Sequence, residues 1–150
     1  MNKNFLTQEE KNWISYAIEQ VEQTTAGEIR VVVVNNTKKF KTVRAAAEKA
    51  FFKYGLNTTV DQTGVLIFLS VEEKRIEILA DTGINAKVEQ STWDALIDKL
   101  AIKIRDGHPG QGICDLVAEI GVVLTQHFPI QPDDDDELSN DVIIEDEDEE

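Results

Sequence analysis

The sequence predicts an α/β fold, a three-layer α/β/α sandwich around a small mixed sheet, and three observations lead to it. Two short runs are apolar on both faces, as is typical of central strands that helices cover on both sides. A short alternating segment follows the second run closely, which indicates a hairpin. Four other segments have apolar residues at helical spacing. The order α-β-α-β-β-α-α then predicts two parallel central strands, joined by a right-handed crossover, and an antiparallel third strand.

The first half of the chain supplies two helices and one strand. Residues 7–10, Thr-Gln-Glu-Glu, have the pattern of a capping box, and residues 8–24 continue as an amphipathic helix. Residues 28–34, Glu-Ile-Arg-Val-Val-Val-Val, are rich in β-branched residues and predict the first central strand. Residues 42–54 return to helical spacing, and Gly55 suits the position that follows a helix end.

The second half supplies the hairpin and two more helices. Residues 64–70 predict the second buried strand, and residues 75–80 predict the strand that returns beside it. Ser91 or Thr92 is expected to cap a third helix, which should stop at the Gly-His-Pro-Gly sequence. Apolar residues at helical spacing within 113–124 predict a fourth helix.

The acidic residues divide the chain into a folded domain over residues 1–130 and a disordered acidic tail over residues 131–150. Residues 133–150 contain 12 of the 29 acidic residues and no basic residue, so the body has 17 acidic against 15 basic residues, a net charge of −2. Nothing in such a chain neutralises phosphate, so duplex nucleic acid and anionic membranes are poor partners. The tail could recruit a basic protein partner, and its short apolar segment, residues 142–144, could dock on the body or on that partner.

The same composition bears on the compartment. The apolar runs are far too short to span a bilayer, and the amino terminus has no apolar stretch of the kind that export signals contain. The single cysteine, Cys114, excludes an internal disulfide and suits a reducing compartment. We therefore expect a cytoplasmic protein, without a membrane anchor and monomeric.

Three carboxylates are expected at one edge of the sheet. Glu28 begins the first strand, Asp61 precedes the second, and Asp81 follows the third, which runs in the opposite direction. Clustered carboxylates repel one another unless they are protonated or bridged by a cation, so Ca²⁺ or Mg²⁺ would relieve the repulsion. The alternative is structural, because turn carboxylates often cap the local backbone and Glu28 could be a solvated residue at a strand end.

The opposite edge is a rival location for a site. Asn35, Asn36, Ser70 and the loop over residues 106–112 are expected at the carboxyl ends of the parallel strands, where open α/β sheets usually bind ligands. The alternative for that loop is a flexible turn between two helices. The sequence has no glycine-rich phosphate-binding motif and no close pair of zinc ligands.

Four segments together resemble the TPM domain family over residues 5–130. They are residues 6–10 (Leu-Thr-Gln-Glu-Glu), 24–31 (Thr-Thr-Ala-Gly-Glu-Ile-Arg-Val), 61–67 (Asp-Gln-Thr-Gly-Val-Leu-Ile) and 76–84 (Ile-Glu-Ile-Leu-Ala-Asp-Thr-Gly-Ile). The resemblance implies a Rossmann-like fold, divalent metal binding with calcium foremost, and a debated acid phosphatase activity. The family includes thylakoid-lumen and photosystem II repair proteins and many bacterial ones. Because the expected export signal and anchor are missing, the repair role does not transfer, and we expect a cytosolic bacterial member.

Three hypotheses of function follow. The first is a metal-binding domain that acts as an interaction or regulatory module, with Glu28, Asp61 and Asp81 as ligands of Ca²⁺, or alternatively of Mg²⁺. The second is a metal-dependent acid phosphatase of low efficiency, for which Arg30 and Arg75 are the nearest basic candidates by sequence. The third is a structural adaptor whose acidic tail recruits a basic partner.

Overall fold

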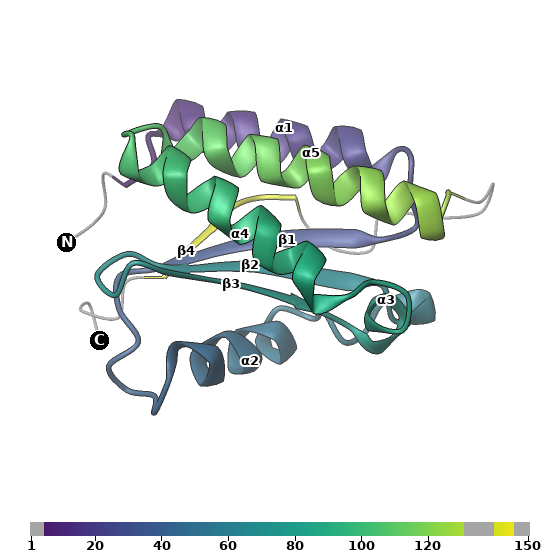
Figure 1. Cartoon of the computed structure of the whole chain (residues 1–150), viewed down its shortest axis with the longest axis horizontal. Coiled ribbons are helices and arrows are strands. Elements are labelled where there is room, and N and C mark those ends of the chain that lie inside the picture. Colours follow the sequence, from purple (N-terminus) through teal and green to yellow (C-terminus); the bar gives the residue numbers. More distant parts are fainter. Residues whose placement is uncertain (1–4, 131–139, 146–150) are drawn as a thin grey trace.

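The computed structural model describes residues 5–130 and 140–145, which form a mixed four-stranded sheet between helices (Figure 1). The predicted α/β class and the sandwich of helix, sheet and helix layers are confirmed. The strands are β1 (Glu28–Val34), β2 (Gly64–Ser70), β3 (Arg75–Ala80) and β4 (Ile143–Glu145). The helices are α1 (Gln8–Glu22), α2 (Val43–Lys53), α3 (Thr82–Asn85), α4 (Gln90–Arg105) and α5 (Pro109–His127), with a short 3₁₀ helix, η1 (Val60–Gln62).

The sheet has the order β3-β2-β1-β4, with β1 and β2 parallel along their whole length. Their register runs from Glu28 opposite Gly64 to Val34 opposite Ser70, and α2 lies on the crossover that joins them. β3 returns antiparallel to β2, as the hairpin prediction requires. The two central strands are buried along nearly their whole length, in keeping with the apolar runs that predicted them.

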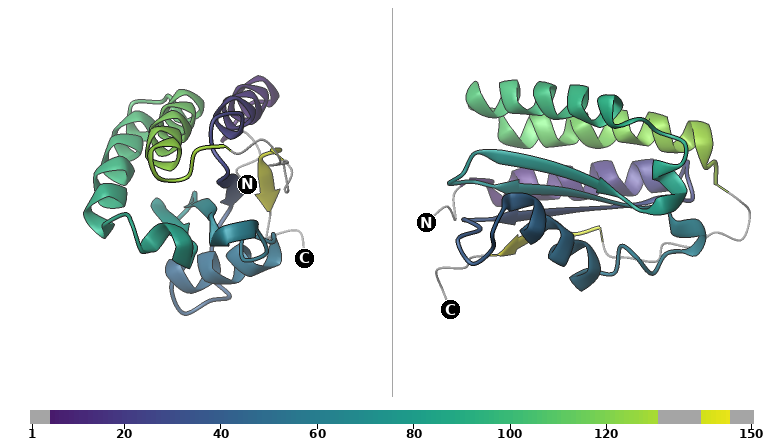
Figure 2. Two further views of the ribbon diagram at one scale, coloured as in Figure 1. Left: turned by 90° about the vertical axis from the view of Figure 1, so that its right-hand side faces the viewer. Right: turned by 60° about the horizontal axis from the view of Figure 1, so that its bottom comes forward.

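Helices cover the two faces of the sheet unequally. α1, α4 and α5 lie on one face and α2 lies on the other, which the left view of Figure 2 shows end-on. Alternate residues of β1 serve the two layers: Val31 and Val33 belong to a larger core cluster under α1, α4 and α5, whereas Val32 and Val34 belong to a smaller core cluster under α2. Side-chain direction along β1 therefore assigns each residue to one of two separate cores.

The helix boundaries confirm most predictions and correct three. The capping box at the start of α1 is present, because Thr7 Oγ1 accepts from Glu10 N at 3.0 Å and Glu10 Oε1 accepts from Thr7 N at 2.8 Å. α4 begins at Gln90 after Glu89, ahead of the expected capping residues, and α3 was not expected at all. The Gly-His-Pro-Gly sequence also starts α5, because proline is tolerated in the first turn of a helix.

None of the helices among the described residues combines the length and the apolar character that crossing a bilayer requires.

The carboxyl-terminal region differs from its prediction more than any other part of the described chain. Residues 143–145 form β4, which pairs in parallel with Val32–Val34, so the prediction of a disordered tail over residues 131–150 is wrong for this segment. Ile143 packs against the smaller core cluster and Val142 against the larger one, which is the docking that the apolar segment allowed. The physical reason is that β4 supplies backbone partners to an edge of β1 that would otherwise present unpaired groups. Residues 131–139 and 146–150 lie outside the described residues.

Candidate functional site

Three segments meet at the end of the sheet where β1 and β2 begin, which we call the amino edge. Glu28 N donates to Thr63 O at 3.1 Å, and Asp81 N donates to Gly64 O at 2.9 Å. Figure 1 shows α3 at this same end, directly after β3. The prediction that the segments carrying Glu28, Asp61 and Asp81 reach one edge of the sheet therefore holds for their backbones.

The side chain of Glu28 belongs to a different environment. It is 2% exposed, and the alternation along β1 places it on the same face as Arg30 and Val32, toward α2. Burial lowers the pKa of Arg30, while charge interactions with Asp141, Glu22 and Glu28 oppose that effect. Glu28 is thus one of three carboxylates around a partly buried arginine, and the alternative of a solvated residue at a strand end is wrong.

Asp61 lies in a loop of unusual backbone shape. Asp61 and Gln62 have φ of 65° and 57°, a left-handed conformation that residues other than glycine seldom adopt. Their carbonyl oxygens face Gly83, where an added Cβ would lie 2.2 Å from Asp61 O and 2.6 Å from Gln62 O. Only glycine fits at this approach, and the loop and the start of α3 consequently form one tight unit.

Asp81 caps the local backbone, as the structural alternative for turn carboxylates proposed. It is the N-cap of α3, and its Oδ1 accepts from Thr82 N at 2.8 Å. Thr82 Oγ1 donates to Gln62 Oε1 at 2.6 Å, which joins α3 to the loop a second time. The side chains of Asp81, Thr82 and Gln62 therefore gather oxygen atoms beside the two carbonyls that face Gly83.

The three predicted ligands do not form the group of carboxylates that was expected. Within residues 5–130 and 140–145, no set of three or more His, Cys, Asp or Glu side chains could hold a metal ion. The structure brings the segments of Asp61 and Asp81 together through η1 and α3, but it buries Glu28 beside Arg30. A site with three carboxylates is thus not seen in the described part of the chain, and the metal ion itself stays a prediction.

At the opposite end of the sheet, the carboxyl edge, Ser70 of the predicted residues belongs to a hydrogen-bonded turn with Thr37 and Glu73. Ser70 Oγ donates to Glu73, while Thr37 N and Thr37 Oγ1 donate to the two carboxylate oxygens of Glu73 at 3.0 and 2.7 Å. Burial raises the pKa of Glu73, but these hydrogen bonds and the charge of Lys38 outweigh it, so the net pKa is below the usual range. The network holds the β2–β3 turn against the end of β1.

The loop over residues 106–112 also has a structural contact. Gly110 N donates to Glu10 Oε2 at 3.2 Å, which ties the start of α5 to the first turn of α1. Gly110 is buried against the Glu10 side chain, where an added Cβ would come within 2.6 Å of two of its atoms. The loop therefore ends in a packed contact between α5 and α1, which differs at Gly110 from the flexible turn that was the alternative.

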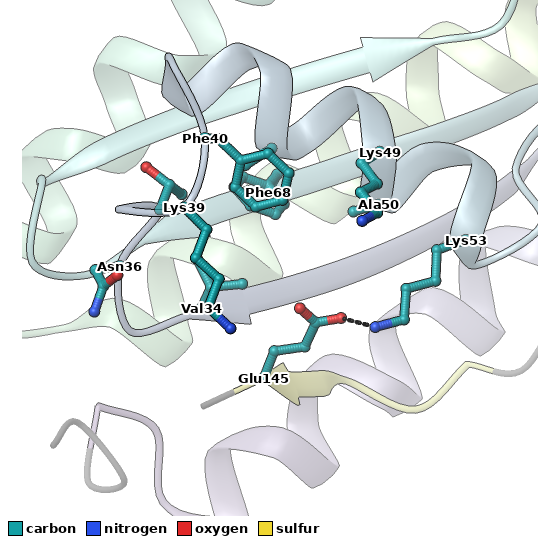
Figure 3. A pocket seen from close by; sticks show the side chains of 11 residues that line it. Val34, Asn36, Lys39, Phe40, Lys49, Ala50, Lys53, Phe68 and Glu145 are labelled. Carbon is teal, nitrogen blue, oxygen red and sulfur yellow. Dashed lines mark hydrogen bonds and ion pairs between the residues drawn. The ribbon is translucent and has the colours of Figure 1, made fainter. Parts of the chain in front are cut away.

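A pocket of about 310 Å³ beside the carboxyl edge was not predicted (Figure 3). Lys39, Lys49 and Lys53 line it on the side of the α2 layer, and Glu145 of β4 enters it from the other side. Lys53 Nζ lies 3.1 Å from Glu145 Oε2, and Tyr54 OH donates to the same oxygen. We call it the lysine pocket. The sequence signal was the spacing of Lys49 and Lys53, one helical turn apart on a segment with a small apolar face.

Aromatic rings hold the cations around the lysine pocket. Tyr54 has Lys53 Nζ at 5.3 Å and Arg30 Cζ at 5.8 Å from its ring centroid, and Lys49 Nζ lies 5.8 Å from the centroid of Phe40. Such cation–π contacts orient an ammonium group without neutralising its charge. The pocket is therefore suited to a carboxylate or another anion, and Glu145 is the anion that it contains.

Comparison with known proteins bears on the family and the fold. A family model described as the TPM domain matches residues 1–123. The NMR structure of the BA42 protein from the psychrophilic bacterium Bizionia argentinensis is 34% identical, with 97% of this chain and 99% of that chain covered and a TM-score of 0.87. A search of curated proteins found no match.

Two more distant structures share the fold alone. The N-terminal domain of cg2496 from Corynebacterium glutamicum is 15% identical, with 81% of this chain and 76% of that chain covered and a TM-score of 0.62. The N-terminal domain of a P. gingivalis protein is 16% identical, with 85% of this chain and 83% of that chain covered and a TM-score of 0.70. The family model and BA42, which matches almost end to end, agree with the four sequence segments described above, and the chain belongs to the TPM domain family.

Proposed function

We propose that this TPM domain binds a divalent cation, calcium foremost, at the amino edge and acts as an interaction or regulatory module. The observation that carries the proposal is the pair of carbonyls at Asp61 and Gln62, both in left-handed conformation and both packed on Gly83. Two adjacent residues in this conformation cost free energy, and such strain is kept mainly where a site needs a particular shape. The carboxylate of Asp81 belongs to the same unit through Thr82.

The oxygen atoms of this edge suit calcium better than a transition metal. Calcium takes six to eight oxygen ligands and accepts backbone carbonyls, amide oxygens and water together with carboxylates. The side chains that would hold it are Asp61 and Asp81, with oxygen from Gln62 and Thr82. Two carboxylates give less charge than the three of the sequence hypothesis, so we expect a weaker and more readily exchanged ion.

Glu28 is left out of this proposed ligand set. Its side chain is buried toward α2 and interacts with the charge of Arg30. Turning this side chain toward Asp61 and Asp81 would take a negative charge away from the partly buried Arg30, which costs free energy. We therefore expect Glu28 to support the fold of β1 and not to ligate the ion.

The alternative of a metal-dependent acid phosphatase depends on a basic group beside the carboxylates. A phosphoryl group in transfer needs cationic groups that stabilise its charge. Arg30 lies over the ring of Tyr54, and Arg75 pairs with Ser70 at the far end of β2 from Asp81. Neither of the two candidates named from the sequence lies beside Asp61 and Asp81, so the geometry favours binding over catalysis.

Calorimetric titration of the full chain with calcium tests the proposal. Asp61→Asn and Asp81→Asn should each lower the calcium affinity by about tenfold or more, because each removes a charged ligand of a hard cation. Asparagine caps helices nearly as well as aspartate, so Asp81→Asn should keep α3 folded. Asp106→Asn, an exposed aspartate at the end of α4, is the matched control and should keep the affinity of the unmodified chain.

Two further variants sharpen the result. Glu28→Gln should keep the calcium affinity, whereas the hypothesis with three carboxylates requires a loss. Calcium affinity that is unchanged in both Asp61→Asn and Asp81→Asn would end the proposal. A parallel assay with a phosphate monoester tests the enzyme alternative, which needs turnover that depends on calcium and disappears in the same two variants.

A further inference from the structure

The outer edge of β1 binds an extended segment in this structure, and the segment comes from the chain's own carboxyl-terminal region. β4 pairs in parallel with Val32–Val34, which is three of the seven residues of β1. β4 is the outermost strand of the sheet, beside β1 (Figure 1). Adding an extended peptide to an exposed strand is a common way in which proteins recognise one another, because the backbone supplies affinity and the side chains supply specificity.

Four side chains of this segment interact with the rest of the domain. Val142 packs against the larger core cluster, Ile143 packs against the smaller one, and Glu145 enters the lysine pocket. Ile144 is 41% exposed and belongs to neither core cluster. Asp141 adds a charge interaction with Arg30. The edge therefore selects an acid, two β-branched residues and, after one free position, a second acid.

Charge complementarity explains why this segment must be acidic. Lys39, Lys49 and Lys53 converge on the pocket, and the carboxylate of Glu145 is 21% exposed between Lys53 and Tyr54. An uncharged residue there would leave these cations without the anion that now faces them. A basic residue would be repelled at close range and in a partly buried setting, where charge interactions are stronger than in water.

The segment is also the part of the sheet that costs least to displace. β4 contains three residues, of which two are partly buried and Ile144 is exposed, whereas β1 and β2 are almost wholly buried. Elements with few buried apolar contacts open at a small fraction of the global free energy of unfolding. Displacing β4 would leave the two-sided core between β1, β2 and the helices in place.

We propose that the edge of β1 and the lysine pocket together form a receptor for an extended acidic peptide of a partner protein. In the free chain residues 141–145 occupy this receptor as an internal competitor. The competing interpretation is that β4 permanently closes a strand edge, as many proteins do to avoid aggregation. An experiment can separate these two interpretations. Only a receptor binds a peptide from another molecule once the internal segment is displaced. This inference is independent of the proposed calcium site.

Fluorescence anisotropy with a labelled peptide that copies residues 140–145 tests the receptor on the full chain. Glu145→Lys should displace the internal segment by repulsion from the three lysines while leaving the pocket intact. The peptide should then bind about tenfold or more tightly to Glu145→Lys than to the unmodified chain, since an internal competitor bound nine-tenths of the time reduces the competent fraction about tenfold. Glu145→Gln is a milder second variant with an intermediate effect, and circular dichroism verifies that both variants are folded.

A reciprocal exchange of charge tests whether the lysine pocket reads the acid. Lys53→Glu should lose the peptide, and a peptide with lysine in place of its last glutamate should bind Lys53→Glu better than it binds Glu145→Lys. Lys99→Glu is the matched control, because Lys99 is exposed and pairs with Glu119 between α4 and α5. This variant should leave the affinity for both peptides unchanged.

Three results would overturn the inference. One is a folded Glu145→Lys chain that binds the peptide no better than the unmodified chain. Another is binding that ignores the charge at the last position of the peptide. Concentration-dependent dimerisation of the unmodified chain, abolished by Glu145→Lys, would instead make the tail of a second copy the occupant and would likewise overturn a foreign partner.

Discussion

Replacing Gly83 by alanine tests the loop on which the proposed cation site depends. The added Cβ would lie 2.2 Å from Asp61 O and 2.6 Å from Gln62 O, and both atoms belong to the backbone. Neither can rotate away as the end of a side chain would, so the loop and α3 must separate. Overpacking of this kind costs about 1–3 kcal/mol. In a chain of 150 residues that corresponds to a fall in Tm of about 2–12 °C.

The assay combines thermal unfolding with calcium. If the ion binds only the folded chain, calcium at a hundred times its Kd should stabilise the unmodified protein by about 2.7 kcal/mol and raise its Tm. Gly83→Ala should show both a lower Tm without calcium and a smaller rise with it. The smaller rise of Tm with calcium is the diagnostic result, because it depends on the shape of the calcium site and not only on the stability of the chain.

Gly121→Ala supplies the matched control. Its Cβ would meet Val21 Cγ2 at 2.6 Å between α1 and α5, so it should lower the Tm while leaving the calcium response intact. The reasoning is refuted if Gly83→Ala has the Tm and the calcium response of the unmodified chain. It is also refuted if both glycine variants lose the calcium response equally, since the loss would then follow general destabilisation.

Three other predictions concern the rest of the fold. Leu56→Ala should lower the free energy of unfolding, measured with urea, by about 2–5 kcal/mol, because Leu56 is fully buried in the smaller core cluster. Glu73→Gln should destabilise the chain at neutral pH. Because the folded-state pKa of Glu73 is depressed, its carboxylate contributes to the free energy of unfolding above the ordinary value of 4.5, and this contribution disappears as pH falls through the folded-state pKa. The stabilities of the two proteins should therefore converge when both are unfolded at decreasing pH. Cys114 should react slowly with iodoacetamide near pH 7 and faster in the unfolded chain, because burial raises the pKa of its thiol.

The parts of the fold that the sequence predicted are those with a local pattern. β1, β2 and the β2–β3 hairpin each have their own run of apolar or alternating residues, and the crossover rule fixes how they are connected. α3 has four residues, too few for a periodic pattern, and its cap appears in the sequence only as a turn. β4 was missed for another reason, because its short apolar segment lies among acidic residues that favour solvation.

At the candidate site, the sequence predicted where the backbone segments lie but not where their side chains point. Topology predicted that the segments with Glu28, Asp61 and Asp81 reach one edge, and the hydrogen bonds to Thr63 and Gly64 agree. Side-chain direction at Glu28 could not be predicted, because Val31–Val34 are apolar on both faces and the pattern of β1 does not show which face lies under α2. The lysine pocket needs β4 beside β1, a pairing across more than a hundred residues that no local pattern specifies.

Coupling between the two ends of the sheet provides a further test of where Glu28 belongs. Arg30 interacts with Glu28 near the amino edge and with Asp141 beside β4, so one cation links both regions. If calcium took Glu28 as a ligand, Arg30 would lose one carboxylate and hold Asp141 more strongly, and calcium would then weaken peptide binding by favouring the internal segment.

If Glu28 stays with Arg30, as the burial of its side chain indicates, the ion at Asp61 and Asp81 has no such path to the tail. We therefore expect saturating calcium to change the peptide affinity of the unmodified chain by less than about fivefold, the lower end of ordinary coupling between sites. A larger change that Arg30→Gln removes would return Glu28 to the ligand set. Coupling is reciprocal, so the calcium affinity measured with and without peptide must show the same factor.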